Sequence, residues 1–485
     1  MKKTIISDFF VIAIITFISA ILFFFRLGNT ALTNWDEAWF GSVAQDMAKS
    51  GSLLAGNWNG QIFFYEPPLL VWLLTLTIKI FGESEFWLRS VSAISGVFTV
   101  IGCYVLAKNI AKSRLAGLLA SLIILSDIEI LFRSRQINVE ILLTVLLLWS
   151  IIFAVKAHEG NKLRWIIFSA VCLGLAFLTK RASPVLALPA IGYLLLRTNL
   201  SLRAPMKSGR GNLIPLVIFF TTFIIITLPW YLLSYLKWGG QFINEFFIGY
   251  TLNKIKSVNA SVGASPFFYL NSLKHAFKLW TPILILIPLS SFKILYSPLK
   301  KALMIFVMVF FLGLTFAPIK SSWFLLPTHP FLAILLGYFL VSIVKFTKLH
   351  KRMKGFVNLS LLFLAVTVSV WQLYHFRNDY IVPDTTNNQA TISRLAGVMV
   401  DKDQPIYLDD EYLPVAVFYS RKKVIPLRFS RTANPVPSLT NIPEGSLVLT
   451  NAETFPVLKS ATGILFDELF SVGDLFLVRA KGIRV

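Results

Sequence analysis

The chain has 485 residues, of which 56% are hydrophobic and only 14% are charged, and its mean hydropathy is +0.70. Soluble globular proteins usually carry about a quarter of charged residues, so this composition excludes a soluble enzyme and predicts a polytopic α-helical membrane protein. The formal net charge of +22 would indicate nucleic-acid binding in a soluble protein, but most basic residues here lie in short loops between apolar runs. We interpret them as determinants of membrane topology and expect no nucleic-acid partner.

Apolar runs of membrane-spanning length recur from the N-terminus to residue 376. The first run follows a basic start, and no A-x-A-like stretch comes after it, so we interpret it as a retained span and not as a cleaved signal. We predict eleven crossings, at residues 9–25, 86–107, 115–132, 138–155, 165–179, 183–196, 213–235, 281–296, 302–318, 322–344 and 355–375.

The segment 67–82 decides the topology, because it is apolar but short, begins with two prolines and contains Lys79. If it does not cross, six loops that together hold twenty lysines and arginines fall on the cytoplasmic side, as the positive-inside rule requires. If it crosses, five of the six move outside. We therefore predict an interfacial helix here and place the first loop, residues 27–85, on the extracytoplasmic side.

The tail, residues 377–485, differs from the membrane domain, residues 1–376. Pro, Asp and Asn become frequent, and short β-branched runs occur at PIYLDD, KKVIPL, GSLVLTN and DLFLVRA. This pattern predicts a small soluble α/β domain, which eleven crossings place outside the membrane.

An adjacent acid pair, Asp36 and Glu37, opens the stretch DEAWFGSVAQDM directly after the first span. Acids at a helix N-terminus capped by Thr33 or Asn34 need no function, because they simply favour the helix dipole. Trp35 and its aromatic neighbours would hold this helix at the membrane surface, however, and an acid there is a candidate functional group.

Further charged residues gather in the predicted outer segments. Tyr65 and Glu66 precede Pro-Pro, where a plain interfacial turn would explain the prolines but not the acid. Arg133 and Arg135 lie between two spans, and Glu140 follows one turn into the next span. Arginine suits phosphate binding through its planar fork of donors, although pairing with carboxylates between helices is the alternative.

Three more cations or titratable groups lie at outer span ends. Lys180 and Arg181 follow one span, and Lys320 precedes the span that contains His329. Such cations usually extend toward lipid headgroups. Their excess on the outer side opposes the positive-inside trend and indicates an anionic substrate, while His329 is expected only to line the cavity.

Motifs for nucleotide binding and zinc are missing from the sequence. There is no G-x-x-x-x-G-K-[ST] and no G-x-G-x-x-G after a strand, so ATP-driven transport and a Rossmann unit are not indicated. No cofactor is predicted with certainty; the outer acids could hold a divalent metal, but their spacing does not demand one.

Taken in order, several motifs resemble the integral-membrane GT-C glycosyltransferases, in particular the branch of protein O-mannosyltransferases and bacterial lipid A aminoarabinose transferases. The resemblance covers about residues 25–345 and rests on these stretches: NWDEAWFGSVAQDMAKSG, YEPPLLVWLL, GESEFWLRSVSAISGV, FRSRQINVEILLT, LGLAFLTKRASPVLALP, LPWY and SSWFLLPTHPFLAILLG.

The resemblance implies a polyprenyl-phosphate sugar donor used at the outer face of the cytoplasmic membrane. Its first-loop acid matches Asp36, which would act on the acceptor with Glu37 beside it. Its second acid matches Glu140, and its phosphate-binding cations match Arg133 or Arg135 and, in the T-K motif, Lys180.

Two positions depart from the family pattern. Glu66 stands where the branch often has a basic residue, and Arg181 stands where glycine often follows the T-K lysine. Arg181 could replace the missing charge.

The sequence thus predicts a glycosyltransferase with a lipid, glycan or protein acceptor. The alternatives are a transporter or flippase of a lipid-linked sugar, and a partner-binding membrane protein. A flippase is disfavoured because the strongest charges lie at span ends and not at the midplane.

Overall fold

The computed structural model describes residues 2–181, 183–198, 213–249, 265, 267–284, 297–317, 320–347, 349–375, 377, 386–401, 403–427 and 442–483. The chain forms two compact units, each built from separate segments. The first comprises Met1–Phe25, Phe64–Leu69 and Ser90–Ile381, and the second comprises Arg26–Phe63, Leu70–Arg89 and Val382–Val485. The second unit therefore includes most of the first loop as well as the tail.

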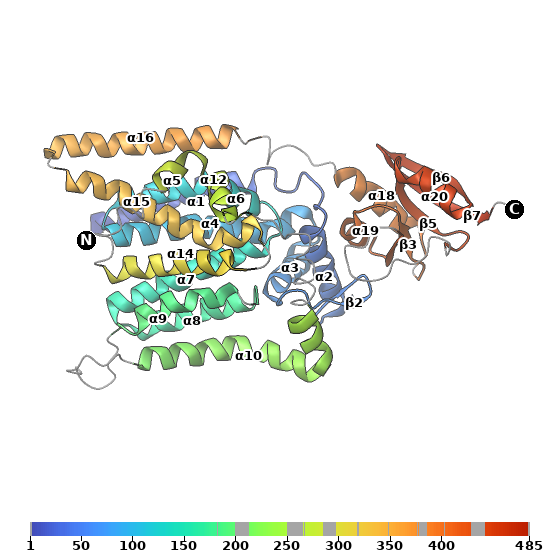
Figure 1. Ribbon diagram of the computed structural model, residues 1–485, viewed down its shortest axis with the longest axis horizontal. Helices are drawn as coiled ribbons and strands as arrows, with labels where there is room; N and C mark the ends of the chain where they lie inside the picture. Colours follow the sequence, from blue (N-terminus) through green and yellow to red (C-terminus); the bar gives the residue numbers. More distant parts are fainter. Residues whose placement is uncertain are drawn as a thin grey trace. The chain divides into compact units, whose positions relative to one another are not determined.

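The first unit is a bundle of apolar helices (Figure 1). Among the described residues, six helices are long and apolar enough to cross a membrane. The helices and short helical turns are α1 (Lys2–Phe24), α4 (Glu85–Ala111, whose first turn belongs to the second unit), α5 (Arg114–Leu125), α6 (Ile128–Arg133), α7 (Val139–Gly160), α8 (Leu163–Phe177), η1 (Ser183–Ala187), α9 (Leu188–Leu195), α10 (Ile214–Phe242), η2 (Ile243–Gly249), α12 (Phe268–Phe277), η4 (Lys278–Trp280), α14 (Pro298–Thr315), η5 (Ser322–Thr328), α15 (His329–Phe346) and α16 (Lys351–His375).

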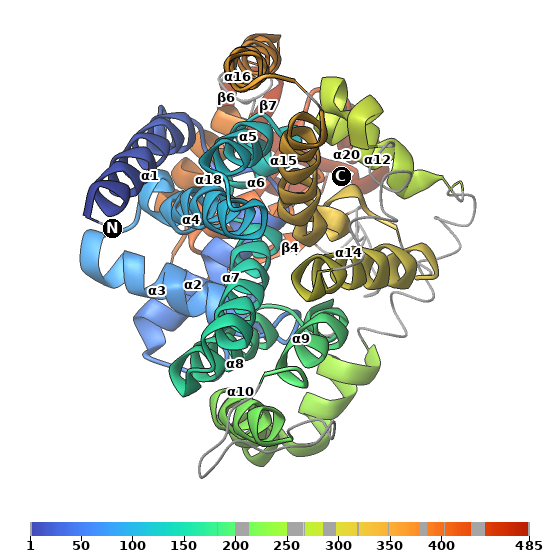
Figure 2. The same ribbon diagram turned by 90° about the vertical axis from the view of Figure 1, so that its left-hand side faces the viewer.

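Small residues let these helices approach one another closely. Helix α8 packs between α7 and α10, and α5 packs against α15 and α16, as Figure 2 shows nearly end-on. On α15, a Cβ added to Gly337 would lie only 2.7 Å from the carbonyl oxygen of Ala116 on α5. Such contacts stabilise helix pairs inside a bilayer, where lipid removes most of the hydrophobic drive.

In the described residues, each predicted span coincides with one helix or with two consecutive helical segments; the span 281–296 lies outside the described residues from 285 onward. The segment 67–82 is the helix α3 (Leu69–Phe81), which has only 13 residues. An α-helical membrane protein is thereby confirmed, whereas the number of crossings stays a prediction.

The predicted span 115–132 was wrong in one respect, because two helices replace it. Helix α5 ends at Leu125, and α6 begins at Ile128 after a break. The Asp127 carboxylate accepts a hydrogen bond of 3.0 Å from the backbone N–H of Ile130. This side-chain cap satisfies an orphan donor and starts the new helix.

The second unit combines elements of the first loop with those of the tail. The loop contributes α2 (Asp36–Ser50), a hairpin of β1 (Asn57–Trp58) and β2 (Gln61–Ile62), and all but the first residue of α3. The tail contributes α18 (Thr386–Met399), β3 (Ile406–Leu408), α19 (Leu413–Ser420), β4 (Val424–Pro426), β5 (Leu447–Asn451), α20 (Thr454–Thr462), β6 (Ile464–Val472) and β7 (Leu475–Ile483).

The tail forms a five-stranded sheet in the order β4-β3-β5-β7-β6. Strand β3 is parallel to β4 and β5, and β7 is antiparallel to β5 and β6. Its core includes the fully buried side chains of Val448, Leu458 and Val478. The predicted α/β character and four of the five strands are confirmed. The sequence analysis missed β6, because Asp467 and Glu468 interrupt its apolar pattern on this edge strand.

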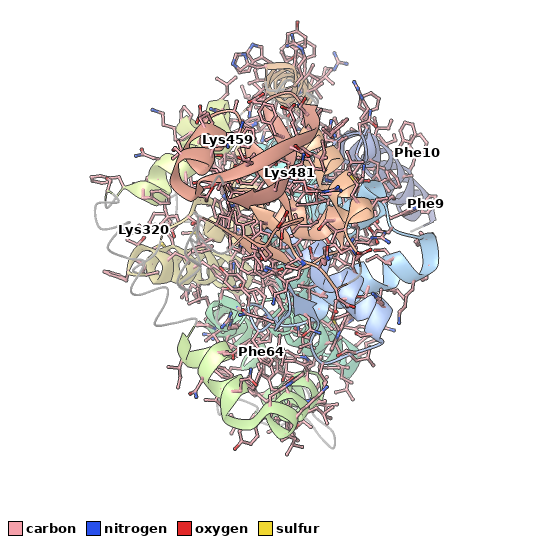
Figure 3. All side chains as sticks on the ribbon, turned by 90° about the vertical axis from the view of Figure 1, so that its right-hand side faces the viewer. Phe9, Phe10, Phe64, Lys320, Lys459 and Lys481 are labelled. Atoms are coloured by element: carbon pink, nitrogen blue, oxygen red, sulfur yellow. The ribbon has the colours of Figure 1, made fainter. Side chains whose placement is uncertain are left out.

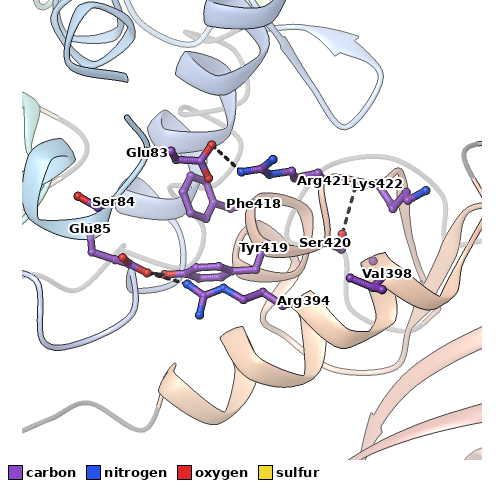
Figure 4. A pocket seen from close by; sticks show the side chains of 11 residues that line it. Glu83, Ser84, Glu85, Arg394, Val398, Phe418, Tyr419, Ser420, Arg421 and Lys422 are labelled. Atoms are coloured by element: carbon purple, nitrogen blue, oxygen red, sulfur yellow. Dashed lines mark hydrogen bonds and ion pairs between the residues drawn. The ribbon is translucent and has the colours of Figure 1, made fainter. Parts of the chain in front are cut away.

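Hydrogen bonds fasten the loop to the tail within this unit. The Asn59 side chain pairs with the main chain of Val424, donating and accepting at 2.8 Å each, and so covers the edge strand β4. The Tyr419 hydroxyl accepts from the Leu32 backbone N–H at 2.7 Å and donates to Glu85 at 2.9 Å (Figure 4). The tail is therefore part of a joint folding unit with the first loop.

We predict that Tyr419→Phe loosens this unit. Its hydroxyl satisfies two polar groups at once, so its removal should cost about 1–3 kcal/mol of local stability. Hydrogen–deuterium exchange in residues 413–420 should accelerate accordingly. The control is Tyr407→Phe, because the Tyr407 side chain is also buried but its hydroxyl makes no hydrogen bond to the described residues.

The same residue sets a pH dependence. Burial raises the pKa of the Tyr419 hydroxyl, and the neighbouring Glu85 carboxylate raises it further. The folded state keeps this proton while an unfolded tyrosine loses it near pH 10, so stability is present below about pH 10 and falls above it. If hydrogen–deuterium exchange in residues 413–420 were equally fast in Tyr419→Phe and in the wild type, the Tyr419 hydroxyl would not stabilise this unit.

Candidate active site

Asp36 and Glu37 open helix α2 but have different surroundings. The turn before them is sharp, with Trp35 at a φ of 66°, a conformation that non-glycine residues rarely adopt. Asp36 is exposed at the first helical position, whereas Glu37 is buried. Neither Thr33 nor Asn34 caps the helix as expected; Trp35 is the cap residue, and Thr33 instead donates to Glu37 from its backbone N–H at 2.8 Å.

Glu37 forms a buried, two-point ion pair with Arg89 from the first turn of α4. The guanidinium Nε and Nη2 donate to the two Glu37 oxygens at 2.8 Å each, and the two side chains are 1% and 4% exposed. Arg89 also donates to three main-chain oxygens of the loop before α2: Leu27, Thr30 and Ala31. Glu37 therefore anchors the start of α2, and this geometry favours a positioning role over contact with substrate.

The sequence analysis missed Arg89. A single arginine within the first turns of an apolar span requires a buried partner, and this requirement could have indicated the role of Arg89 from the sequence.

The aromatic residues around the acids also pack inside this unit. The Trp39 ring lies 5.4 Å from the rings of both Trp58 and Phe63, so α2 rests on the β1–β2 hairpin.

The first unit brings a second acid and cation set together. The Lys180 ammonium, just after α8, pairs with Glu140 in the first turn of α7 and lies 4.7 Å from the centre of the Phe324 ring on η5. Both side chains are largely buried, at 14% and 6% exposure. Asn138 caps α7 and accepts from the backbone N–H of Glu140 at 3.0 Å, which fixes this acid at the helix start.

The two departures from the family pattern meet in this unit. Arg181 donates to the main-chain oxygens of Tyr65 and Phe246, and its Nε lies 3.9 Å from a Glu66 oxygen. Burial lowers the pKa of Arg181, and the Glu66 carboxylate opposes that shift. The acid before Pro-Pro and the arginine after Lys180 are thus neighbours of opposite charge.

The remaining predicted cations differ in their engagement. Arg135 donates to the main-chain oxygens of Leu22, Phe23 and Phe25 and so caps the end of α1, which favours a structural role. Arg133 lies 3.4 Å from Glu129, with its guanidinium 4.6 Å from the Trp323 ring centre. Lys320 lies partly exposed before η5 and is labelled in Figure 3.

His329 belongs to the packed interior of the first unit. It is 1% exposed, and its Nδ1 lies 2.9 Å from an Asp127 oxygen at the α5–α6 break. None of the described residues supplies a hydrogen-bond partner for its Nε2. In the same part of the chain, no group of three or more His, Cys, Asp or Glu side chains forms a metal site.

Comparisons with known proteins agree with the resemblance read from the motifs. The family described as dolichyl-phosphate-mannose-protein mannosyltransferase matches residues 65–225. An uncharacterized protein of Aquifex aeolicus is 29% identical over 71% of this chain and 65% of its own length. The undecaprenyl phosphate-alpha-4-amino-4-deoxy-L-arabinose arabinosyl transferase of Pseudomonas aeruginosa (strain UCBPP-PA14) is 25% identical over 70% of this chain and 61% of its own length. The aligned part thus spans less than two thirds of either relative.

Solved structures match over nearly the whole chain. ArnT from Cupriavidus metallidurans superposes with a TM-score of 0.74 at 16% identity, covering 97% of this chain and 98% of that one. The Archaeoglobus fulgidus oligosaccharyltransferase gives 0.57 at 11% identity, over 97% and 73% of the two chains. The protein is therefore an integral membrane protein with the GT-C glycosyltransferase fold, as the motif order predicted.

We predict that Arg89→Met destabilises the second unit strongly. It leaves Glu37 as an uncompensated buried charge, which costs about 3–5 kcal/mol. The measurement is the fraction of detergent-solubilised protein that stays monodisperse after heating. The matched control is Arg394→Met, because the ion pair of Arg394 with Glu85 is 57% exposed on the arginine side and should cost less than about 1 kcal/mol.

A double variant separates charge from packing. Glu37→Leu combined with Arg89→Met removes both buried charges, so it should unfold at a higher temperature than Arg89→Met alone. A double variant that is no more stable than the single one would show that Glu37 does not depend on Arg89.

Proposed function

We propose that this protein transfers a sugar from a polyprenyl-phosphate donor to an acceptor at the extracytoplasmic face of the cytoplasmic membrane. The observation that supports this proposal most directly is the difference within the acid pair. Glu37 is buried against Arg89, while Asp36, on the same turn, is exposed. Support also comes from ArnT of Cupriavidus metallidurans, which shares the fold and has a structure bound to undecaprenyl phosphate.

In the proposed reaction, an oxygen of the acceptor attacks the anomeric carbon of the sugar, and Asp36 accepts the proton that this oxygen loses. The bond between that carbon and the phosphate oxygen breaks, and polyprenyl phosphate leaves with the electron pair. A positioned base commonly contributes about 10²–10⁴-fold to the rate. Glu37 and Arg89 hold the start of α2 still, which such positioning requires.

The leaving phosphate needs cations, and Lys180 and Arg181 are proposed for this role with Arg133 and Lys320. Lys180 and Arg181 are held near acids, Glu140 and Glu66, so their charge is partly compensated before the donor binds. A phosphate would compete with these carboxylates for the same donors. Arg135 is not among the proposed phosphate ligands, because its guanidinium already donates to main-chain oxygens at the end of α1.

We expect Asp36→Asn to lower transfer at least about 10³-fold without unfolding the protein, because Asp36 is exposed but Asn cannot accept the proton. The assay follows release of polyprenyl phosphate from a labelled polyprenyl-phosphate sugar. The control is Asp467→Asn, which changes a partly exposed acid on β6 that pairs with Lys481, and it should keep full activity. Full activity of Asp36→Asn would refute its role.

Lys180→Gln should lower kcat/KM for the donor by about 10²–10³-fold, because one donor to the developing phosphate charge is lost. Arg135→Gln should instead lower heat stability while leaving kcat/KM of the surviving protein within about twofold, since its donors cap α1. If Lys180→Gln lowered only heat stability and Arg135→Gln lowered kcat/KM, Arg135 and not Lys180 would be the phosphate-binding residue.

A further inference from the structure

The second unit contains a groove that the proposed chemistry does not use. It lies between the second half of α2, the β1–β2 hairpin, the end of α3 and the segment from Val417 to Lys423, and its volume is about 840 Å³. The groove is open, and its lining combines polar residues, including Gln45 and Asn57, with apolar ones such as Ile78 and Val417. Its size is that of a ligand site for several sugar rings.

Positive charge dominates this groove. Five lysines and arginines line it, against the two carboxylates of Asp46 and Glu83. Both acids are already engaged. Asp46 accepts from the backbone N–H of Asn57 at 2.7 Å, and Glu83 pairs with Arg421 at 3.0 Å (Figure 4).

Two of the five cations are held by polar groups, and among the described residues the other three have no side-chain partner. Arg421 forms an ion pair with Glu83, and the Lys422 ammonium donates to the main-chain oxygens of Val400 and Asp401. Within the part of the chain that the structure describes, Lys49, Lys79 and Lys423 are exposed and make no side-chain hydrogen bond or ion pair.

Helix dipoles explain these lysines only in part. Lys49 and Lys79 lie in the last turns of α2 and α3, where a cation is favourable. Lys423 lies on no helix and precedes β4, yet it borders the same groove. Three like charges from three elements around one hollow repel one another, and a cleft lined by one sign of charge attracts ligands of the opposite sign.

We propose that this groove binds an acidic saccharide, one that carries carboxylate or phosphate groups, as the extended part of the acceptor. The side-chain NH2 groups of Gln45 and Asn57 donate to Glu83 and Asp46, so their carbonyl oxygens can accept from sugar hydroxyls. The lysines suit the acidic groups. At a rise of about 1.5 Å per residue, the groove begins about 9 Å from Asp36 at Ser42 and reaches about 20 Å at Lys49. The acceptor role rests on the proposed function, whereas binding of the acidic saccharide does not.

The test compares two triple variants of the full-length protein in uncharged detergent. The groove variant is Lys49→Gln, Lys79→Gln and Lys423→Gln. The control is Lys459→Gln, Arg479→Gln and Lys481→Gln, which removes the same net charge from α20 and β7, where Figure 3 labels Lys459 and Lys481. The probes are a labelled oligogalacturonate, a phosphorylated oligomannose and, as the neutral reference, maltohexaose.

The wild type should bind at least one acidic probe more tightly than maltohexaose, with affinity falling as salt is added. The groove variant should bind that probe about tenfold more weakly, and the control within about twofold. Asp36→Asn should bind like the wild type, so that loss of transfer and loss of binding are separable. Absence of binding by both acidic probes, or equal weakening in both triple variants, would overturn the proposal.

One other source of anionic groups is an anionic lipid surface, because exposed Ile80 and Phe81 adjoin Lys79. Vesicles with and without anionic lipid distinguish it. If the groove variant loses vesicle binding but keeps the affinity for the acidic oligosaccharide, the groove is a lipid contact and the saccharide proposal is wrong.

Discussion

The buried ion pair of Glu37 and Arg89 is the constraint on which the second unit depends. A charge taken out of water is costly unless its partner is held in good geometry, so each residue requires the other. Arg89 joins α4, α2 and the loop that precedes α2 through six hydrogen bonds to Glu37, Leu27, Thr30 and Ala31. Asp36, one residue away, is thereby held at the start of a fixed helix and remains exposed.

The same rule governs the cations of the membrane unit. Glu140 faces Lys180, and Glu66 faces Arg181, so both of these buried acids are near a cation. The pair of Glu66 and Arg181 shows the same matching of charge, because the acid before Pro-Pro lies 3.9 Å from the arginine. A phosphate-bearing donor can bind such cations by taking over the role of the carboxylates.

Much of this architecture could be predicted from the sequence, because apolar length and loop charge report directly on helices in a bilayer. Local hydropathy could not reveal the break at Asp127, which depends on one capping carboxylate. The role of Glu37 was also hidden, since its partner lies 52 residues away in the chain. The joint unit of first loop and tail rests on single hydrogen bonds, such as those of Asn59 and Tyr419, which carry no periodic signal.

The proposed transfer breaks the bond between a sugar and a polyprenyl phosphate. The most direct measurement uses purified protein in vesicles that contain a polyprenyl-phosphate sugar labelled in both its lipid and its sugar, together with extracts of cell-envelope glycans as acceptors. If the protein is this transferase, the two labels separate, and free polyprenyl phosphate and a glycosylated product form in equal amounts. Movement of both labels together across the bilayer, without cleavage, would contradict it.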